Sequence, residues 1–288
     1  MKSDYLKEII WVVPDSTFET AGRRRAVLLH LRAITKKHGG SREAIRIGET
    51  QLSSTVLGKP LTVCTLRSLP ELTESVLLDV DVDFLVIPYV SFGKSDDHGA
   101  LPWCWPNDLL ARLRSRGFRT DLVTISCSVE GGYTPLKWKY LGEELAERLK
   151  QAGEDEPMIR AMDRMRAAAM SAGRGDFVMA EQGYLEARRL LPNSPAPLYH
   201  LAHLYADMGH RSDGQSCYQQ ALALDPSYRT AYNSAGLAAY REGRFRRAGR
   251  EFRRTLELDP QDPYACFGLG LLAGQARRWK DAEALLRN

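Results

Sequence analysis

The stretch YNSAGLAAYREGRFRRAGREFRRTLELDP, residues 232–260, holds most of one copy of a pattern that recurs along the second half of the chain. Glycines and prolines return on both sides of it at a spacing of 34 residues. The recurring positions are Gly175, Gly209 and Gly243 in one set and Pro192, Pro226 and Pro260 in the other. A period of this length is typical of stacked helical hairpins. We predict four repeats, called repeats 1 to 4, that begin near Ala161, Pro195, Arg229 and Pro263.

Each repeat has the pattern of two helices joined by a turn. In repeat 2, the apolar residues Leu198, Leu201 and Tyr205 recur at helical spacing, and Gly209 follows where the chain must turn. Each second helix stops at or just before a proline, because proline cannot continue a helix. No single hairpin can bury its apolar face alone, so neighbouring hairpins must stack. We therefore predict an all-α repeat domain over residues 161–288, preceded by a linker at 152–160.

These repeats resemble the tetratricopeptide repeat family, whose 34-residue unit has a W-x2-L-G-x2-Y pattern, then A-x3-F, then proline. Repeat 3 matches best, with Gly236, Ala239, Ala248, Phe252 and Pro260 on consensus positions. The resemblance implies that the first helices line a groove for a peptide or a protein partner. It places eight residues in this predicted groove: Tyr199, His203, Asn233, Leu237, Tyr240, Arg241, Tyr264 and Phe267. The alternative is that this surface only packs against the other domain.

The first half, residues 1–151, alternates apolar runs with helical patterns. Five runs are expected to be strands, and they cover residues 8–13, 43–47, 61–66, 76–82 and 121–127. Helices are expected at 20–38, 107–116 and 135–150. Strands that alternate with helices favour a mostly parallel sheet covered on both faces. The predicted fold is therefore an α/β domain followed by the helical repeats.

Three carboxylates stand at alternate positions near the end of the fourth of these strands, in LLDVDVDF: Asp79, Asp81 and Asp83. A continuous central strand would place all three on one face, and burying an unpaired carboxylate costs several kcal/mol. A divalent cation with oxygen ligands would compensate for that charge. The alternative is that only Asp79 or Asp81 is inside and Asp83 faces solvent.

Three motifs in the first half, IIWVVPDSTFE, LLDVDVDFLV and SVEGGYTPLKWKYL, resemble the arginase-related group that includes peptide arginases. The resemblance covers residues 4–150. It implies a binuclear manganese (Mn²⁺) site that hydrolyses a guanidino group, with Asp79, Asp81 and Asp83 as candidate metal ligands. It places Glu130 where that family holds the substrate guanidinium. The relatives also carry an earlier His-x-Asp-x-His-x-Asp stretch that is absent here, so we expect an incomplete metal site and a chain truncated at its N-terminus. We also expect the last repeat to be incomplete.

The composition of the chain indicates its class of partner and its cellular compartment. The chain has 40 Lys and Arg residues against 36 Asp and Glu residues, a small excess that solvated helix faces explain, so we predict no nucleic-acid partner. The five cysteines are far apart in the sequence and show no metal-binding spacing, which favours free thiols in a reducing compartment. Neither a signal peptide nor an 18-residue apolar run is visible, so we expect no membrane partner and a cytoplasmic location.

Two functional hypotheses follow from the two halves. The first is a manganese-dependent hydrolase that converts peptidyl arginine to ornithine and urea, with the repeats recruiting the peptide or a partner. The alternative is a protein interaction scaffold, in which the repeats bind a partner and the α/β domain is catalytically inactive.

Overall fold

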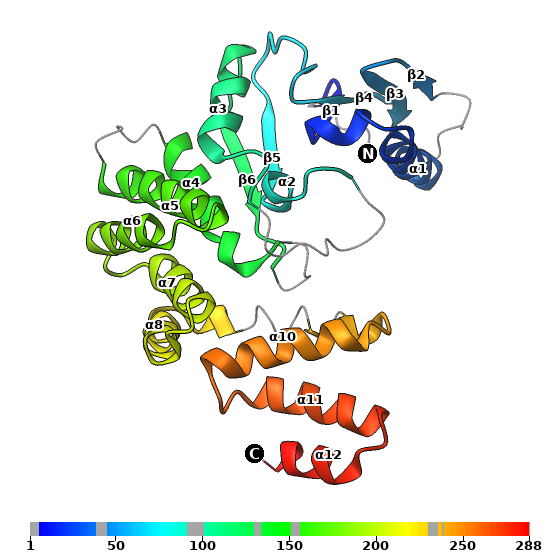
Figure 1. Cartoon of the computed structure of the whole chain (residues 1–288). Helices are drawn as coiled ribbons and strands as arrows, with labels where there is room; N and C mark the ends of the chain where they lie inside the picture. Colours follow the sequence, from blue (N-terminus) through cyan, green and yellow to red (C-terminus); the bar gives the residue numbers. More distant parts are fainter. Residues whose placement is uncertain are drawn as a thin grey trace. The chain divides into compact units, whose positions relative to one another are not determined.

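A computed structural model describes residues 6–38, 45–90, 101–129, 134–150, 156–229, 236–237 and 239–287 (Figure 1). The chain divides into two compact units, Met1–Ser126 and Cys127–Asn288. This division lies well before the linker predicted at 152–160. Residues 127–150 group with the repeats because helix α4 (Tyr140–Leu149) packs on the first repeat helix, α5 (Pro157–Gly173). Among the described residues, no helix is long and apolar enough to cross a bilayer.

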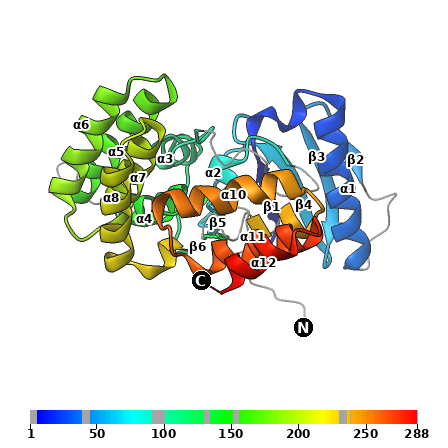
Figure 2. The ribbon, with the colours of Figure 1, turned by 60° about the horizontal axis from the view of Figure 1, so that its bottom comes forward.

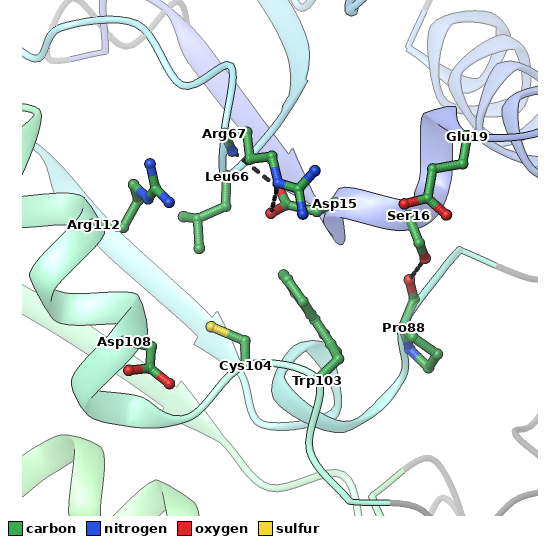
Figure 3. A pocket seen from close by; sticks show the side chains of 10 residues that line it. All are labelled: Asp15, Ser16, Glu19, Leu66, Arg67, Pro88, Trp103, Cys104, Asp108 and Arg112. Carbon is green, nitrogen blue, oxygen red and sulfur yellow. Dashed lines mark hydrogen bonds and ion pairs between the residues drawn. The ribbon is translucent and has the colours of Figure 1, made fainter.

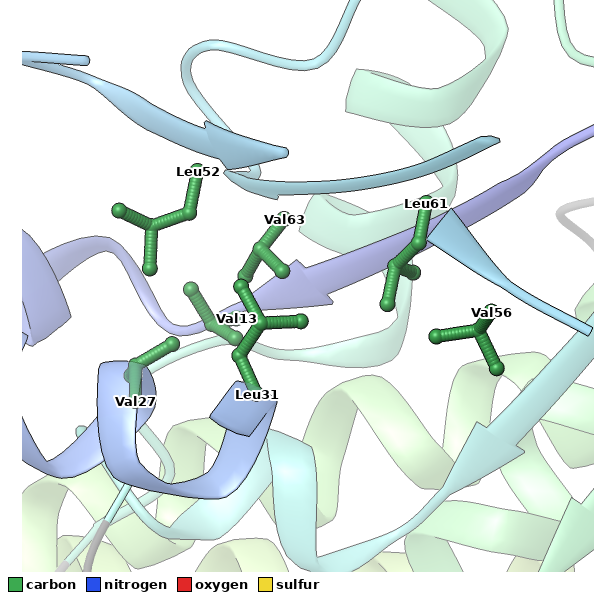
Figure 4. Close-up of a cluster of buried hydrophobic side chains, with 7 residues drawn as sticks. All are labelled: Val13, Val27, Leu31, Leu52, Val56, Leu61 and Val63. Atoms are coloured by element: carbon green, nitrogen blue, oxygen red, sulfur yellow. The ribbon is translucent and has the colours of Figure 1, made fainter. Parts of the chain in front are cut away.

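The first unit contains a four-stranded sheet with the spatial order β1-β4-β3-β2. Its strands are β1 (Ile9–Val13), β4 (Lys59–Thr65), β3 (Gln51–Val56) and β2 (Arg46–Ile47). Strands β1 and β4 are parallel, with Ile9 opposite Leu61, whereas the other two pairs are antiparallel. Helix α1 (Ala21–Lys37), preceded by the short helix η1 (Asp15–Phe18), contributes Val27 and Leu31 to the core against this sheet (Figure 4).

Strand β3 is absent from the sequence prediction. Its sequence, QLSSTV, has only two large apolar residues, Leu52 and Val56, and both are buried. The position between them on the same face is Ser54, whose hydroxyl pairs with that of Thr35 on α1 at 3.0 Å. The buried Ser54 side chain is therefore stabilised by a hydrogen bond, where most strands have an apolar side chain. Because Ser54 is polar, the strand lacks the alternation of apolar and polar residues by which a strand is recognised in a sequence.

A second, two-stranded sheet pairs β5 (Leu77–Asp81) with β6 (Leu122–Ser126) in parallel. Helices α2 (Asp83–Val86) and α3 (Pro106–Ser115) lie in the connection between them. The predicted strand–helix–strand unit is thus confirmed, but the prediction of one mostly parallel sheet is wrong. The described strands form two sheets, and two of their four pairings are antiparallel. The hairpin of β3 and β4 causes this difference, because its two-residue turn can only join antiparallel strands.

The second unit consists of helices. The short helix η3 (Leu136–Trp138) and α4 precede the repeats, which are built from the pairs α5 and α6 (Phe177–Leu190), α7 (Pro195–Asp207) and α8 (Arg211–Leu224), and α11 (Pro263–Gln275) and α12 (Trp279–Leu286). The short helix η4 (Pro226–Arg229) follows α8, and repeat 3 contributes α10 (Phe245–Leu258) as its second helix. Figure 2 shows α5 to α8 as neighbouring antiparallel helices. The helical repeats are therefore confirmed; within the described residues, repeats 1, 2 and 4 show both helices and repeat 3 shows its second.

The predicted turn glycines have the backbone conformation that requires them. Gly175, Gly209 and Gly243 have φ angles of 80°, 79° and 74°, in the left-handed region that favours glycine. The fourth repeat has Arg277 at the equivalent position, with a φ angle of 58°. The 34-residue period therefore reflects one conserved turn geometry inside this chain, even where its residue type changes.

Candidate functional site

The three candidate metal ligands of the first unit do not share one strand face. Asp79 is exposed on β5 and accepts a hydrogen bond from the hydroxyl of Thr124, the residue opposite it on β6. Asp83 is not part of the strand, which ends at Asp81; it begins helix α2. The expectation of three carboxylates on a buried central strand is therefore wrong. The expectation assumed that the face of the strand carrying Asp79 is buried. This face is exposed, because Leu77 and Leu122, which flank Asp79 and Thr124, are exposed too.

Asp81 and Asp83 remain neighbours at the end of β5. The backbone N–H of Asp83 lies 3.4 Å from Oδ1 of Asp81. Burial, together with the neighbouring Asp81 carboxylate, raises the pKa of Asp83 to about 6. Within the part of the chain that the structure describes, no three His, Cys, Asp or Glu side chains are arranged to hold a metal ion. The described residues thus do not supply a binuclear manganese site, and Glu130 lies outside them.

A pocket of about 280 Å³ in the first unit is lined by polar and aromatic side chains from η1, α3 and the segments near them (Figure 3). Arg67 binds Asp15 twice, through Nε at 3.0 Å and through its backbone N–H at 3.0 Å. The Ser16 hydroxyl donates to the carbonyl oxygen of Pro88. These groups bind one another across the pocket, so we assign their contacts to packing.

The predicted groove is closed at repeat 2. Tyr199 is only 2% exposed, and its ring lies 5.0 Å from that of Tyr228 and 4.5 Å from that of His203, measured between ring centres. Lys139 covers Tyr228 from the other side, with Nζ 5.3 Å from the ring centre. The same ammonium group binds the Asp225 carboxylate at 2.9 Å. Tyr199 is therefore a core residue of this unit and is not available to a partner.

His200, the next residue, fixes the segment that precedes the repeats. Its Nε2 is 2.8 Å from the carbonyl oxygen of Lys137, and because a carbonyl can only accept, Nε2 carries the proton. Three rings surround the imidazole at 5.0 to 5.6 Å: Trp138, Tyr140 and Tyr184. Burial lowers the pKa of His200 to about 3, so the ring is neutral near pH 7. Residues 137–140 thus pack on α7 at His200, the residue next to Tyr199.

In repeat 4, the helix face that corresponds to that of Tyr199 is exposed to solvent. Phe267 stands 68 residues after Tyr199, two repeat periods on, but is 49% exposed. Tyr264, three residues earlier on α11, is 61% exposed, and Leu271 continues the same stripe as a half-buried residue. We call Tyr264, Phe267 and Leu271 the α11 stripe. An aromatic stripe in this position is an apolar surface that a partner can cover.

The remaining groove residues fall between these extremes. Leu237 and Tyr240 are half-buried and pack on the core of Ala239, Ala248, Phe252 and Ala265. The Tyr240 ring is 5.5 Å from that of Phe245, between centres. Arg241 is exposed, His203 is half-buried, and Asn233 lies outside the described residues. Among the described residues of the predicted groove, Tyr199 is thus buried, whereas Arg241, Tyr264 and Phe267 are exposed.

Sequence reasoning missed the residues that close repeat 2. Trp138, Lys139 and Tyr140 belong to a stretch that was assigned to the α/β half, and no pattern in it indicates a helix 60 residues away as its partner. His200 interrupts the helical spacing of apolar residues in α7. That interruption, together with the unmatched aromatic pair Trp138 and Tyr140, is the only signal that the sequence offers.

Comparisons with known proteins support the repeats. A family model described as tetratricopeptide repeat matches residues 199–263 and 235–288. Small glutamine-rich tetratricopeptide repeat-containing protein 2 of Mycosarcoma maydis is 31% identical over 101 residues, which is 35% of this chain and 28% of that protein. Tetratricopeptide repeat protein 6 of Homo sapiens is 35% identical over 57 residues, 20% of this chain and 11% of that protein. The chain thus spans less than a third of either relative.

Solved structures with the repeat fold also match. The crystal structure of MamA has a TM-score of 0.29 and 18% identity, covering 54% of this chain and 92% of that one. The first repeat domain of Spaghetti (RPAP3), bound to the HSP90 peptide SRMEEVD, has a TM-score of 0.28 and 20% identity, covering 46% of this chain and 96% of that one. The tetratricopeptide assignment rests on the family model and on the repeats themselves. The arginase-related resemblance of residues 4–150 stays a prediction.

Proposed function

We propose that this chain is a protein interaction scaffold whose repeats bind a polypeptide through repeats 3 and 4. The observation that carries the proposal is the contrast between Tyr199 and Phe267. These residues share one repeat position, but residues of the same unit bury the first and leave half of the second exposed. Residues 199–288, which include both, match the tetratricopeptide repeat model.

The α11 stripe suits an apolar or aromatic anchor of the partner. Burial of exposed aromatic side chains is the largest source of affinity in most protein interfaces. Arg241, exposed and one repeat earlier, adds a cation for a carboxylate or for backbone carbonyl groups of the partner. A partner held this way needs only a short segment, because the predicted groove does not continue to Tyr199.

The test uses peptides selected from a random display library on the immobilised full chain. The double variant Y264S/F267S removes the two exposed aromatic rings, and V178S/M179S is its matched control, because Val178 and Met179 are exposed apolar residues of α6. We expect Y264S/F267S to bind the selected peptides about tenfold more weakly or worse, measured by titration calorimetry, and V178S/M179S to bind like the wild type. Equal affinity of wild type and Y264S/F267S for every selected peptide contradicts the proposal.

A guanidino hydrolase of the arginase type is the second candidate. One feature favours it: Asp81 and Asp83 lie at the carboxyl end of the parallel pair β5 and β6, the edge where α/β folds bind ligands. Elemental analysis after equilibration with MnCl₂, together with urea release from an arginine-containing peptide, tests it. The hydrolase predicts bound manganese and urea that both disappear in D81N/D83N. A chain that binds peptide but yields neither acts as a scaffold.

A further inference from the structure

Helix α10 carries five arginines on one side: Arg246, Arg247, Arg250, Arg253 and Arg254. We call them the arginine face. Four of them are exposed and Arg247 is half-buried, whereas Ala248, Phe252 and Thr255 of the same helix are fully buried. The helix is therefore divided sharply into a packed side and a cationic side. From Arg246 to Arg254, nine residues, the arginine face extends about 12 Å along the helix axis.

The repeat framework does not require these arginines. The same five positions hold Val178, Met179, Gln182, Leu185 and Glu186 in repeat 1 and Ser212, Asp213, Ser216, Gln219 and Gln220 in repeat 2. Neither set contains a cation, although both helices pack in the same way. Neighbouring arginines at i, i+3 and i, i+4 also repel one another and weaken the helix. The five arginines thus weaken helix α10 and are not needed for the repeat fold. We therefore attribute them to the binding of a ligand.

The charge of the whole chain is concentrated in the same region. Residues 229–288 contain 12 Lys and Arg residues against seven Asp and Glu residues, so this part has an excess of five while the chain as a whole has an excess of four. Arg254 lies 3.9 Å from Asp207, at the outer limit of an ion pair, and both side chains are about half exposed.

We propose that the arginine face is a docking surface for a short acidic segment of a partner protein. Guanidinium groups bind carboxylates through paired hydrogen bonds, which a run of arginines one helical turn apart can repeat along a peptide. A nucleic acid presents phosphates continuously and rewards a longer basic surface. Here carboxylates stand at both ends, Glu242 before the helix and Glu257 in its last turn, and they limit the surface to a short ligand.

This surface is separate from the α11 stripe, because it lies on the second helix of repeat 3 and consists of cations. Fluorescence anisotropy with fluorescein-labelled hexaglutamate tests it on the full chain. The variant R246S/R250S/R253S/R254S removes four charges of the face. The control R32Q/K36Q/K37Q/R46Q removes four charges from exposed residues of the first unit and so gives the same net charge.

We expect the wild type and the control to bind hexaglutamate within about twofold of each other, and the arginine-face variant to bind at least tenfold more weakly. Replacing the same four arginines by lysine should give an intermediate affinity, because the charge stays while the paired geometry is lost. The arginine-face variant should melt close to the wild type, since the four arginines that it replaces are exposed side chains, and this separates lost binding from lost folding.

Three results overturn the proposal. The first is no binding of hexaglutamate by the wild type at 50 mM NaCl. The second is an equal loss in the control, which shows that only net charge matters. The third is tighter binding of a twelve-residue oligothymidylate than of hexaglutamate, which assigns the face to nucleic acid. Y264S/F267S should bind hexaglutamate like the wild type, so failure of the peptide-binding proposal is distinguishable from failure of this one.

Discussion

Arg277 occupies a turn position that glycine holds in the three preceding repeats. Its φ angle of 58° is sterically costly for a residue with a side chain, whereas Gly243 adopts 74° without that cost. Figure 1 shows this turn between α11 and α12. The fourth repeat therefore carries a local strain that the others avoid, and the strain is a property of one residue.

Arg277→Gly should stabilise the second unit by about 0.5–1 kcal/mol, because relief of the left-handed strain exceeds the extra entropy of glycine in the unfolded chain. Urea unfolding followed by circular dichroism measures the change. The reciprocal variant Gly243→Arg should destabilise by a similar amount. An Arg277→Gly protein that unfolds at lower urea concentration than the wild type contradicts this reading of the turn.

His200 makes stability depend on pH through its buried neutral ring. Its pKa falls from 6.5 to about 3 on folding. Above pH 6.5 neither state is protonated and His200 contributes no pH dependence. Below 6.5 the unfolded state takes up a proton that the folded state does not, so stability falls by up to about 1.4 kcal/mol for each pH unit until the folded pKa is reached.

The variant His200→Gln keeps a donor for the Lys137 carbonyl but does not titrate. Between pH 7 and pH 5, the wild type should lose about 2 kcal/mol more stability than His200→Gln, because one and a half pH units lie below the unfolded pKa. Urea unfolding at the two pH values gives both numbers. Identical losses in the two proteins would show that the ring is accessible to protons in the folded state.

Among the packed elements, helix α10 places the Phe252 ring directly against helix α11. Phe252 is fully buried, and a methyl group added at Gly268 on α11 would lie only 2.3 Å from the ring. The absence of a side chain at Gly268 thus sets how closely α10 and α11 approach. Gly274, on the same helix, has its nearest neighbour at 3.8 Å and leaves room for a methyl group.

Gly268→Ala should destabilise the second unit by about 1–3 kcal/mol, since the aromatic ring cannot move without disturbing the core around it. Gly274→Ala is the matched control and should be neutral or stabilising by up to about 1 kcal/mol, because alanine favours the helix. Thermal unfolding compares the two. Equal melting temperatures for both variants contradict the close packing of α10 against α11.

Elements with a strong local pattern could be predicted from the sequence. The repeat helices, α1, α3 and the strands β1, β4, β5 and β6 all follow from periodicity, and the turn glycines follow from their spacing. Strand β3 could not be predicted, because one of its buried positions is the polar residue Ser54, which forms a hydrogen bond with Thr35. The antiparallel pairing of β3 with β4 was missed for the same reason.

Some features of the candidate site could be predicted from the sequence and others could not. The exposure of Tyr264 and Phe267 follows from a repeat pattern that places them on the first-helix face. The burial of Tyr199 does not, because it depends on residues such as Lys139, 60 positions earlier, whose contacts no local pattern records. For the carboxylates, alternation identified the face of Asp79 correctly but could not show that this face is exposed.

At the scale of the whole molecule, the second unit presents two distinct surfaces, the α11 stripe and the arginine face. The first consists of apolar and aromatic side chains and the second of guanidinium groups, so binding to the second should weaken with added salt while binding to the first should change little. Both lie within residues 229–288, which hold the excess positive charge of the chain. The repeats before them are closed by the chain itself at Tyr199 and His200.

Amide hydrogen exchange of the full chain, with and without a library-selected peptide, shows which repeat the partner binds. The peptide should slow exchange in Pro263–Gln275 and leave Pro195–Asp207 unchanged, because Tyr199 on α7 is already buried within the unit. Slowed exchange in Pro195–Asp207 with no change in Pro263–Gln275 would place the partner on repeat 2 and contradict the proposed binding to repeats 3 and 4.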